Sequence, residues 1–93
     1  MFKPSSWHGI PEYMHEGLSN WIDHGIEPGS FLSAVLRNDL SDAFARADIT
    51  NSRLVRNYVE FLYTEAPSNC WGSPEKMEQW KLMKKQERML ADE

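Results

Sequence analysis

Two short segments carry the residue types best suited to binding an anion, because in each a glycine and a serine stand directly before an expected helix. The pairs are Gly29-Ser30 and Gly72-Ser73. Glycine allows a close approach of the backbone, and serine supplies a hydroxyl. The first N–H groups of a helix lie at the positive end of its dipole, where a phosphate can bind. The alternative is that both serines are ordinary N-caps whose hydroxyls satisfy those donors.

Three further side chains extend the chemistry from phosphate binding to base recognition. Asn69 has amide donors and an acceptor suited to the edge of a base, and Trp71 offers a flat surface for stacking. Tyr13 could stack in the same way or pack in the core, where its hydroxyl would need a partner. The candidate ligand-binding residues are therefore Tyr13, Gly29, Ser30, Asn69, Trp71, Gly72 and Ser73.

The residues that could catalyse a reaction or hold a metal do not form a recognisable pattern. His8, His15 and His24 are seven and nine residues apart, and neither HExxH nor CxxC occurs. No base is implied beside Cys70, so we expect a small packed residue rather than a nucleophile. The sequence therefore predicts no metal, no cofactor and no enzymatic activity.

Length and composition predict one small domain that gains burial by self-association. The chain has 93 residues and a single cysteine, which excludes an internal disulfide. A chain this short buries only about 60–65% of its unfolded surface. Its four Trp, four Phe, three Tyr and five Met are a large apolar load, part of which we expect at subunit or ligand interfaces. The net charge of −4 argues against binding to duplex nucleic acid, which favours a basic face.

The sequence also predicts a protein that stays in the cytoplasm. The first residues contain no apolar run typical of a signal peptide, and no stretch approaches the about 20 apolar residues that cross a bilayer. A lone cysteine fits a reducing compartment. We expect no membrane partner.

The elements that must position the candidate residues are predicted to be all helical. Residues 1–9 are expected to be irregular, with Phe2 and Trp7 either docked on the domain or part of a frayed terminus. A first helix should begin near Pro11 and end at His24-Gly25. Gly17 in its middle implies a close approach by another helix.

A second helix should form the spine of the core. From Phe31 to Ala47 the apolar residues recur at steps of three and four, which predicts one amphipathic helix from an N-cap at Ser30 to about residues 46–48. A third helix should start within a residue or two of Asn51, with Asp48 as the alternative cap. Its β-branched and aromatic content leaves a strand as the competing interpretation.

The last helix has the strongest start signal of the chain. Ala66–Gly72 should form a loop, after which Ser73 is an N-cap, Pro74 occupies the first helical position and Glu75 the first turn. We expect a C-terminal helix over residues 74–93 with a frayed tail from Ala91, and with a basic run at residues 81–88 that is a solvated face or steers an anionic ligand. The predicted fold is thus all-α, an oligomeric bundle of about four helices in a single domain over residues 1–93.

The segments GIEPGSFLSAVLRNDLSDAFARAD and FLYTEAPSNCWGSPEKMEQW resemble a family of small bacteriophage proteins. Among characterised proteins, they resemble the phage anti-CBASS proteins that act as sponges for cyclic oligonucleotides. The resemblance covers about residues 10–80. It rests on the Gly-Ser-Phe-Leu helix start, the triplet Asn38-Asp39-Leu40, the pair Ala47-Asp48 and the Cys-Trp-Gly-Ser-Pro loop.

The resemblance implies an all-helical protein that assembles into compact hexamers in the host cytoplasm. Such proteins bind cyclic di- and trinucleotide signals of the host CBASS immune system without cleaving them, so that the death effector is never activated. In the family, dinucleotides lie between subunits, with bases stacked on a tyrosine, here Tyr13, and phosphates held by a lysine, where this chain has Pro28. Trinucleotides occupy separate pockets, which map to Ser30, Asn69, Gly72 and Ser73. Some relatives place an arginine at the position of Asn69.

Two other functions remain open from the sequence. The first is a protein–protein inhibitor that blocks a host enzyme or transcription factor with an acidic, aromatic-rich surface. The second is a small nucleotide hydrolase, which the lack of a metal or nucleophile pattern makes the weakest of the three hypotheses.

Overall fold

The computed structural model describes residues 1–91, which form six α-helices, two short 3-10 helices and no strand. In chain order the elements are η1 (Glu12–Met14), α1 (His15–His24), α2 (Ser30–Leu36), α3 (Leu40–Arg46), α4 (Ile49–Ser52), α5 (Val55–Glu65), η2 (Ser68–Cys70) and α6 (Pro74–Ala91). The all-α prediction is confirmed for this part of the chain. The described part of the chain has six α-helices where about four were expected, and most of them are shorter than expected.

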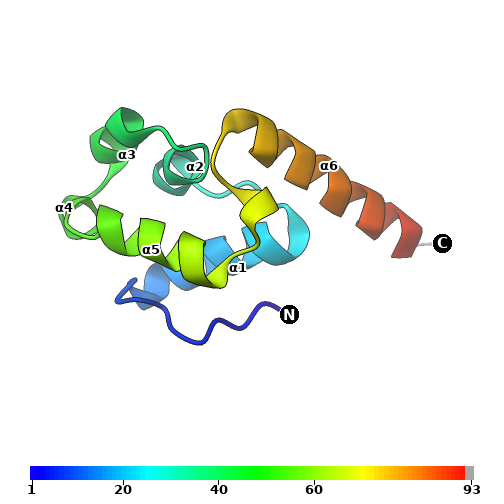
Figure 1. Cartoon of the computed structure of the whole chain (residues 1–93), viewed down its shortest axis with the longest axis horizontal. Coiled ribbons are helices and arrows are strands. Elements are labelled where there is room, and N and C mark those ends of the chain that lie inside the picture. The colour runs from blue at the N-terminus through cyan, green and yellow to red at the C-terminus, as the bar shows by residue number, and fades with distance from the viewer. Residues whose placement is uncertain (92–93) are drawn as a thin grey trace.

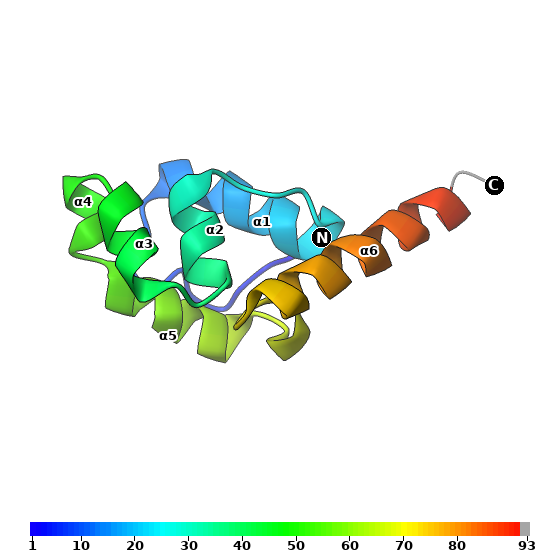
Figure 2. The same ribbon diagram turned by 90° about the horizontal axis from the view of Figure 1, so that it is seen from above.

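The helices form a compact body from which α6 projects (Figure 1). Seen from above, α2 lies between α1 and α5, while α6 starts beside the body and carries the C-terminal end away from it (Figure 2). The molecule measures 44 × 26 × 20 Å along its principal axes. Its long axis is due in large part to α6.

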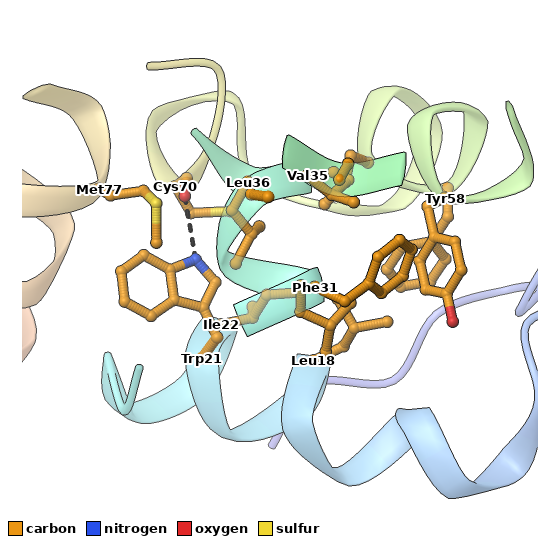
Figure 3. Packing of buried hydrophobic residues seen from close by; sticks show 14 of the residues in the cluster. Leu18, Trp21, Ile22, Phe31, Val35, Leu36, Tyr58, Cys70 and Met77 are labelled. Atoms are coloured by element: carbon orange, nitrogen blue, oxygen red, sulfur yellow. Dashed lines mark hydrogen bonds between the residues drawn. The ribbon is translucent and has the colours of Figure 1, made fainter. Parts of the chain in front are cut away.

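The hydrophobic core is built around α2. Every residue from Phe31 to Leu36 is buried, whereas Ala43 is the only buried residue of α3. The side chains around α2 come from α1, α5, η2 and the first turns of α6 (Figure 3). The largest fully buried side chains are Trp21, Tyr58, Phe61, Leu18, Leu36, Leu62 and Cys70.

The prediction of one continuous helix from Ser30 to about residues 46–48 is wrong. The helix stops after Leu36, and Asn38 adopts a left-handed conformation with φ of 65°. Asp39 then caps α3, because its Oδ1 accepts a hydrogen bond of 3.1 Å from the amide of Asp42. Asparagine tolerates the left-handed region and aspartate is a favoured N-cap, so these two residues account for the break.

A helix does begin within two residues of Asn51, at Ile49, but the continuous third helix that was expected is divided into two. Asp48, the alternative cap, accepts a hydrogen bond of 2.7 Å from the amide of Asn51 and begins the one-turn helix α4. The longer α5 begins only at Val55. Asn51 is itself buried, and its Oδ1 accepts a hydrogen bond of 2.7 Å from the hydroxyl of Tyr58. Within the segment for which a strand was the alternative, Val55–Glu65 is helical.

The predicted end of the first helix is confirmed, but its start is shifted. Residues from Glu12 form the 3-10 turn η1, and α1 begins at His15. It ends before Gly25, which takes the left-handed conformation with φ of 66°. At Gly17 an added Cβ would lie 3.2 Å from Cδ1 of Leu32. The expected close approach is therefore made by α2.

The predicted start of the last helix is confirmed. The Oγ of Ser73 accepts a hydrogen bond of 3.1 Å from the amide of Lys76, and Pro74 is the first residue of α6. Ala91 is still helical. The expected fraying of residues 92–93 lies outside the described residues.

The N-terminal segment is irregular, as predicted, and of the two alternatives it is docked rather than frayed. The indole of Trp7 stacks between the rings of His15 and Phe61, with centroid distances of 3.8 and 5.2 Å. The amide and hydroxyl of Ser5 donate hydrogen bonds of 2.6 and 2.7 Å to the carboxylate of Glu65. The first ten residues are thus tied to α1 and α5.

Candidate functional site

Six of the seven candidate residues line three hollows on the surface, and Ser73 lines none of these three. Tyr13, Gly29 and Ser30 line a hollow of about 250 Å³, which we call the Tyr13 hollow. Trp71 and Gly72 line a hollow of about 380 Å³, the Trp71 hollow. Asn69 lines a third hollow of about 440 Å³, the Asn69 hollow.

The Tyr13 hollow is apolar and contains no basic side chain among its lining residues. Tyr13 is 63% exposed, so the alternative that it packs in the core is wrong. Its hydroxyl donates a hydrogen bond of 3.0 Å to Oδ2 of Asp48. Desolvation of the hydroxyl and the nearby Asp48 carboxylate raise the pKa of Tyr13 above its usual value. The other lining residues are Met14, Gly17, Pro28, Gly29, Ser30, Phe31 and Leu32.

The N-cap of the helix at this hollow lies one residue before the predicted position. Gly29, not Ser30, is the N-cap of α2, and no side chain caps it. Ser30 is the first helical residue. Because α2 has only seven residues, its dipole provides little charge for an anion.

The loop before α6 is held in place by one hydrogen bond that it accepts from the body and one that it donates to the body. The indole N–H of Trp21 donates to the carbonyl of Cys70 at 2.9 Å (Figure 3). The amide of Gly72 donates to the carbonyl of Leu36, at the end of α2, at 2.7 Å. Since α1 and α2 both contribute, the position of Trp71 between these two anchors is set by the core.

Cys70 is a packed residue, as predicted. Its side chain is fully buried, and this burial raises the pKa of the thiol to about 12. The thiol is therefore protonated at neutral pH and shielded from solvent, which makes it a poor nucleophile.

The Trp71 hollow combines aromatic rings with a cation. The rings of Trp71 and Tyr63 meet edge to face at 5.0 Å, and Tyr63 is 76% exposed. Asn38, at the break between α2 and α3, also lines the hollow, and Lys76 is the only charged residue of the described chain that lines it. The Nζ of Lys76 lies 3.5 Å from the carbonyl of Ser68. Among the described residues, no carboxylate lies within ion-pair distance of it.

The Asn69 hollow adjoins the Trp71 hollow through Lys76, which lines both. Its remaining lining residues are Asn69, Gln79, Trp80 and Met83. Of the described residues that line this hollow, Lys76 is again the only charged one. Ser73 lines neither hollow, and its hydroxyl is engaged as the cap of α6.

Sequence reasoning missed three residues that line the Trp71 hollow. Lys76 had a visible signal, because it lies in the first turn of a strongly marked helix, five residues after Trp71. Tyr63 stands in a largely apolar stretch of sequence, which gave no sign that it lies on the exposed side of its helix. Asn38 had no signal, since only the tertiary fold brings it to the loop.

No protein-family model, curated protein or solved structure matches the chain. Within residues 1–91, no three histidine, cysteine, aspartate or glutamate side chains are grouped so that they could hold a metal ion. None of the described helices is both long and apolar enough to cross a membrane.

Proposed function

We propose that the protein is a phage anti-defence protein that binds cyclic oligonucleotide immune signals and sequesters them without cleavage, so that the CBASS effector is not activated. The observation that carries this proposal is the Trp71 hollow. Tyr63, Trp71 and Lys76 line this hollow together, and the exposed ring of Tyr63 meets the ring of Trp71 edge to face. Aromatic rings stack on bases and a lysine attracts phosphate, so the hollow fits the two chemical parts of a nucleotide.

Lys76 supplies a positive charge that this chain lacks at the two positions where the resemblance places basic residues. The position of the family lysine is Pro28 here, and Asn69 stands where some relatives carry arginine. Because Lys76 has no described carboxylate partner, an anionic ligand would not have to displace one. We therefore favour binding at the loop before α6 over binding at the Tyr13 hollow.

Binding without cleavage is supported by the state of Cys70, the one thiol of the chain. Cys70 is buried, and its raised pKa keeps it protonated. The ligand would then leave the protein chemically unchanged.

A capture-and-release assay tests this proposal. The protein is incubated with cyclic di- and trinucleotides and removed by filtration, and free ligand is measured before and after the protein is digested. We expect loss of free ligand followed by full recovery of intact ligand. Loss without recovery would instead indicate a hydrolase, and no loss would contradict sequestration.

A pair of lysine variants localises the captured ligand. Lys76→Gln should weaken capture about tenfold, the equivalent of about 1.4 kcal/mol. Lys85→Gln removes the same charge from an exposed position of α6 outside the three hollows and should have little effect. Equal effects of the two substitutions would place the ligand elsewhere.

Self-association is part of the proposal, and the resemblance implies a hexamer. It is supported by the outer face of α6, where large apolar side chains are 38–69% exposed. These side chains are Leu82, Met83, Met89 and Leu90. Sedimentation velocity over a range of concentrations measures the number of subunits, and a monomer at every concentration would contradict this part.

A second candidate function is inhibition of a host enzyme or transcription factor by direct contact. The observation in its favour is an apolar groove of about 470 Å³ between α3 and α5, with Arg53 and Arg56 among its lining residues. Leu40 and Phe44, which also line it, are 63% and 49% exposed. Recovery of one stoichiometric host protein in a pull-down, together with no capture of cyclic nucleotides, would favour this function.

A further inference from the structure

The Trp71 hollow and the Asn69 hollow form one composite surface with Lys76 between them. Lys76 lines both hollows, and among residues 1–91 it is the only charged residue that lines either of them. Their volumes, about 380 and 440 Å³, are similar. A ligand that fills both hollows therefore meets one central cation with an uncharged cavity on each side.

Both hollows contain aromatic and amide groups, but in different proportions. In the Trp71 hollow the exposed Tyr63 ring and the half-buried Trp71 ring are open to stacking, and Asn38 adds one amide. In the Asn69 hollow the amides of Asn69 and Gln79 are both exposed. Each hollow can thus receive a planar heterocycle with polar edges.

The aromatic ring of the Asn69 hollow is less available for stacking. Trp80 is only 7% exposed, its indole N–H donates to the carbonyl of Trp21 at 3.0 Å, and Nζ of Lys84 lies 4.9 Å from its ring centroid. A heterocycle in this hollow therefore contacts the edge of Trp80 and the side chain of Met83. Its recognition depends mainly on hydrogen bonds from the two amides.

The ligand that matches this arrangement has one anionic group flanked by two uncharged heterocycles. A phosphodiester that links two nucleosides has this constitution. We propose that the two hollows together hold one nucleoside–phosphodiester–nucleoside unit, with the phosphate on Lys76, one base stacked on Tyr63, and the other base hydrogen-bonded by Asn69 and Gln79. The proposal rests on the nucleotide-binding function above and sets its smallest ligand at two linked nucleosides.

The proposal separates two nucleotides that differ by one nucleoside. Adenylyl-(3′→5′)-adenosine can fill both hollows, whereas adenosine monophosphate can fill only one. The monophosphate carries more negative charge than the phosphodiester, so attraction to Lys76 alone would favour the monophosphate. Isothermal titration calorimetry on the full chain should nevertheless give about tenfold tighter binding of the dinucleotide.

Three substitutions of exposed residues test the role of each part. Tyr63→Ala and Gln79→Ala should each weaken dinucleotide binding about tenfold, and Gln79→Ala should leave binding of the monophosphate unchanged. Lys76→Gln should weaken binding of both ligands, and the control Lys85→Gln should weaken neither. Far-UV circular dichroism of each variant verifies that the fold is intact.

The outcomes distinguish this proposal from the proposed function. Equal affinities for the two ligands, no effect of Gln79→Ala on the dinucleotide, or no dinucleotide binding would overturn the composite site, even if cyclic oligonucleotides are captured. Conversely, tighter dinucleotide binding that depends on Tyr63 and Gln79 would support the composite site, even if the capture assay with cyclic signals fails.

Discussion

The two ends of the chain show opposite relations between regular structure and anchoring. Residues 1–10 include no helix, yet they are fixed by the stack of Trp7 between His15 and Phe61 and by the hydrogen bonds of Ser5 to Glu65. The end of α6 is fully helical, yet residues 85–90 are all exposed. Backbone regularity and tertiary anchoring are thus separate properties here.

The difference follows from where each segment places its apolar side chains. Phe2 and Trp7 turn inward and pack against Phe61. In α6, Met77 and Trp80 pack on the body, whereas Met89 and Leu90 lie on an outward face and are 61% and 69% exposed. The N-terminal segment should therefore contribute to the stability of the monomer, while the end of α6 should contribute little to it.

Deleting each end in turn should give the largest difference in unfolding free energy between the two regions. Removal of residues 1–9 exposes the ring of Phe61 and should lower the free energy of unfolding by about 4 kcal/mol, since it removes two packed aromatic side chains. Removal of residues 86–93 should lower it by less than about 1 kcal/mol in the monomer. Urea denaturation followed by circular dichroism, at concentrations where sedimentation shows monomers, measures both. Similar losses for the two deletions would contradict the comparison.

A pair of single substitutions repeats the test with less perturbation. Trp7→Ala removes the ring between His15 and Phe61 and should cost about 3 kcal/mol of unfolding free energy. Leu90→Ala, the matched control in α6, should change that free energy by no more than about 0.5 kcal/mol. If the control proved as costly as Trp7→Ala, the end of α6 would have a partner within the monomer.

Two glycine substitutions test whether α6 packs on the body at Lys84. Gly25 contacts α6 there, and Gly29 is the control. Gly25 has φ of 66°, and an added Cβ would lie 2.8 Å from Cβ of Lys84 in α6. Gly25→Ala should therefore cost about 1–2 kcal/mol of unfolding free energy. Gly29 has no neighbour within 4 Å of its added Cβ and φ of −62°, so Gly29→Ala should cost no more than about 0.5 kcal/mol. Thermal unfolding of both variants measures the difference.

Acidification should weaken the anchoring of the N-terminal segment, with the smallest effect of the four. Hydrogen bonds from the hydroxyl and amide of Ser5 hold the pKa of Glu65 below its usual value of 4.5. The ionised carboxylate therefore stabilises the fold above pH 4.5, and this contribution is lost as the pH falls through the lowered pKa.

Melting temperatures measured between pH 7 and 3 check this prediction. The wild type should lose more stability on acidification than Glu65→Gln, which cannot titrate at this position. Glu12→Gln, at an exposed position, is the control and should behave like the wild type. A Glu65→Gln variant with an unchanged pH dependence would contradict the assignment.

Sequence predicted two helix boundaries at which glycine or proline fixes the backbone, whereas the first α-helix begins later than Pro11 indicated. His24-Gly25 and Ser73-Pro74 are such boundaries, and both are as expected. The break at Asn38 was missed because the apolar spacing continues across it. An amphipathic pattern records which residues face the core, and it does not record whether the backbone between them stays helical.

The candidate site was predictable only where its residues are close in the chain. Asn69, Trp71 and Gly72 lie within one loop, so their proximity needed no tertiary information. Tyr63 and Asn38 reach the same surface because α5 and the end of α2 pack beside that loop. The separation of the Tyr13 hollow from this surface likewise depends on helix packing, which sequence spacing does not encode.

The hydrogen bond from Trp21 to Cys70 also gives the molecule an internal spectroscopic reporter. Of the four indole N–H groups, those of Trp21 and Trp80 donate to carbonyls in buried surroundings, whereas those of Trp7 and Trp71 have no such acceptor in the described structure. In deuterated water, two indole proton resonances should vanish quickly and two should persist until the protein opens globally. The persistent pair then follows the core, while the Trp71 resonance, observed in ordinary water, follows the loop at the candidate site.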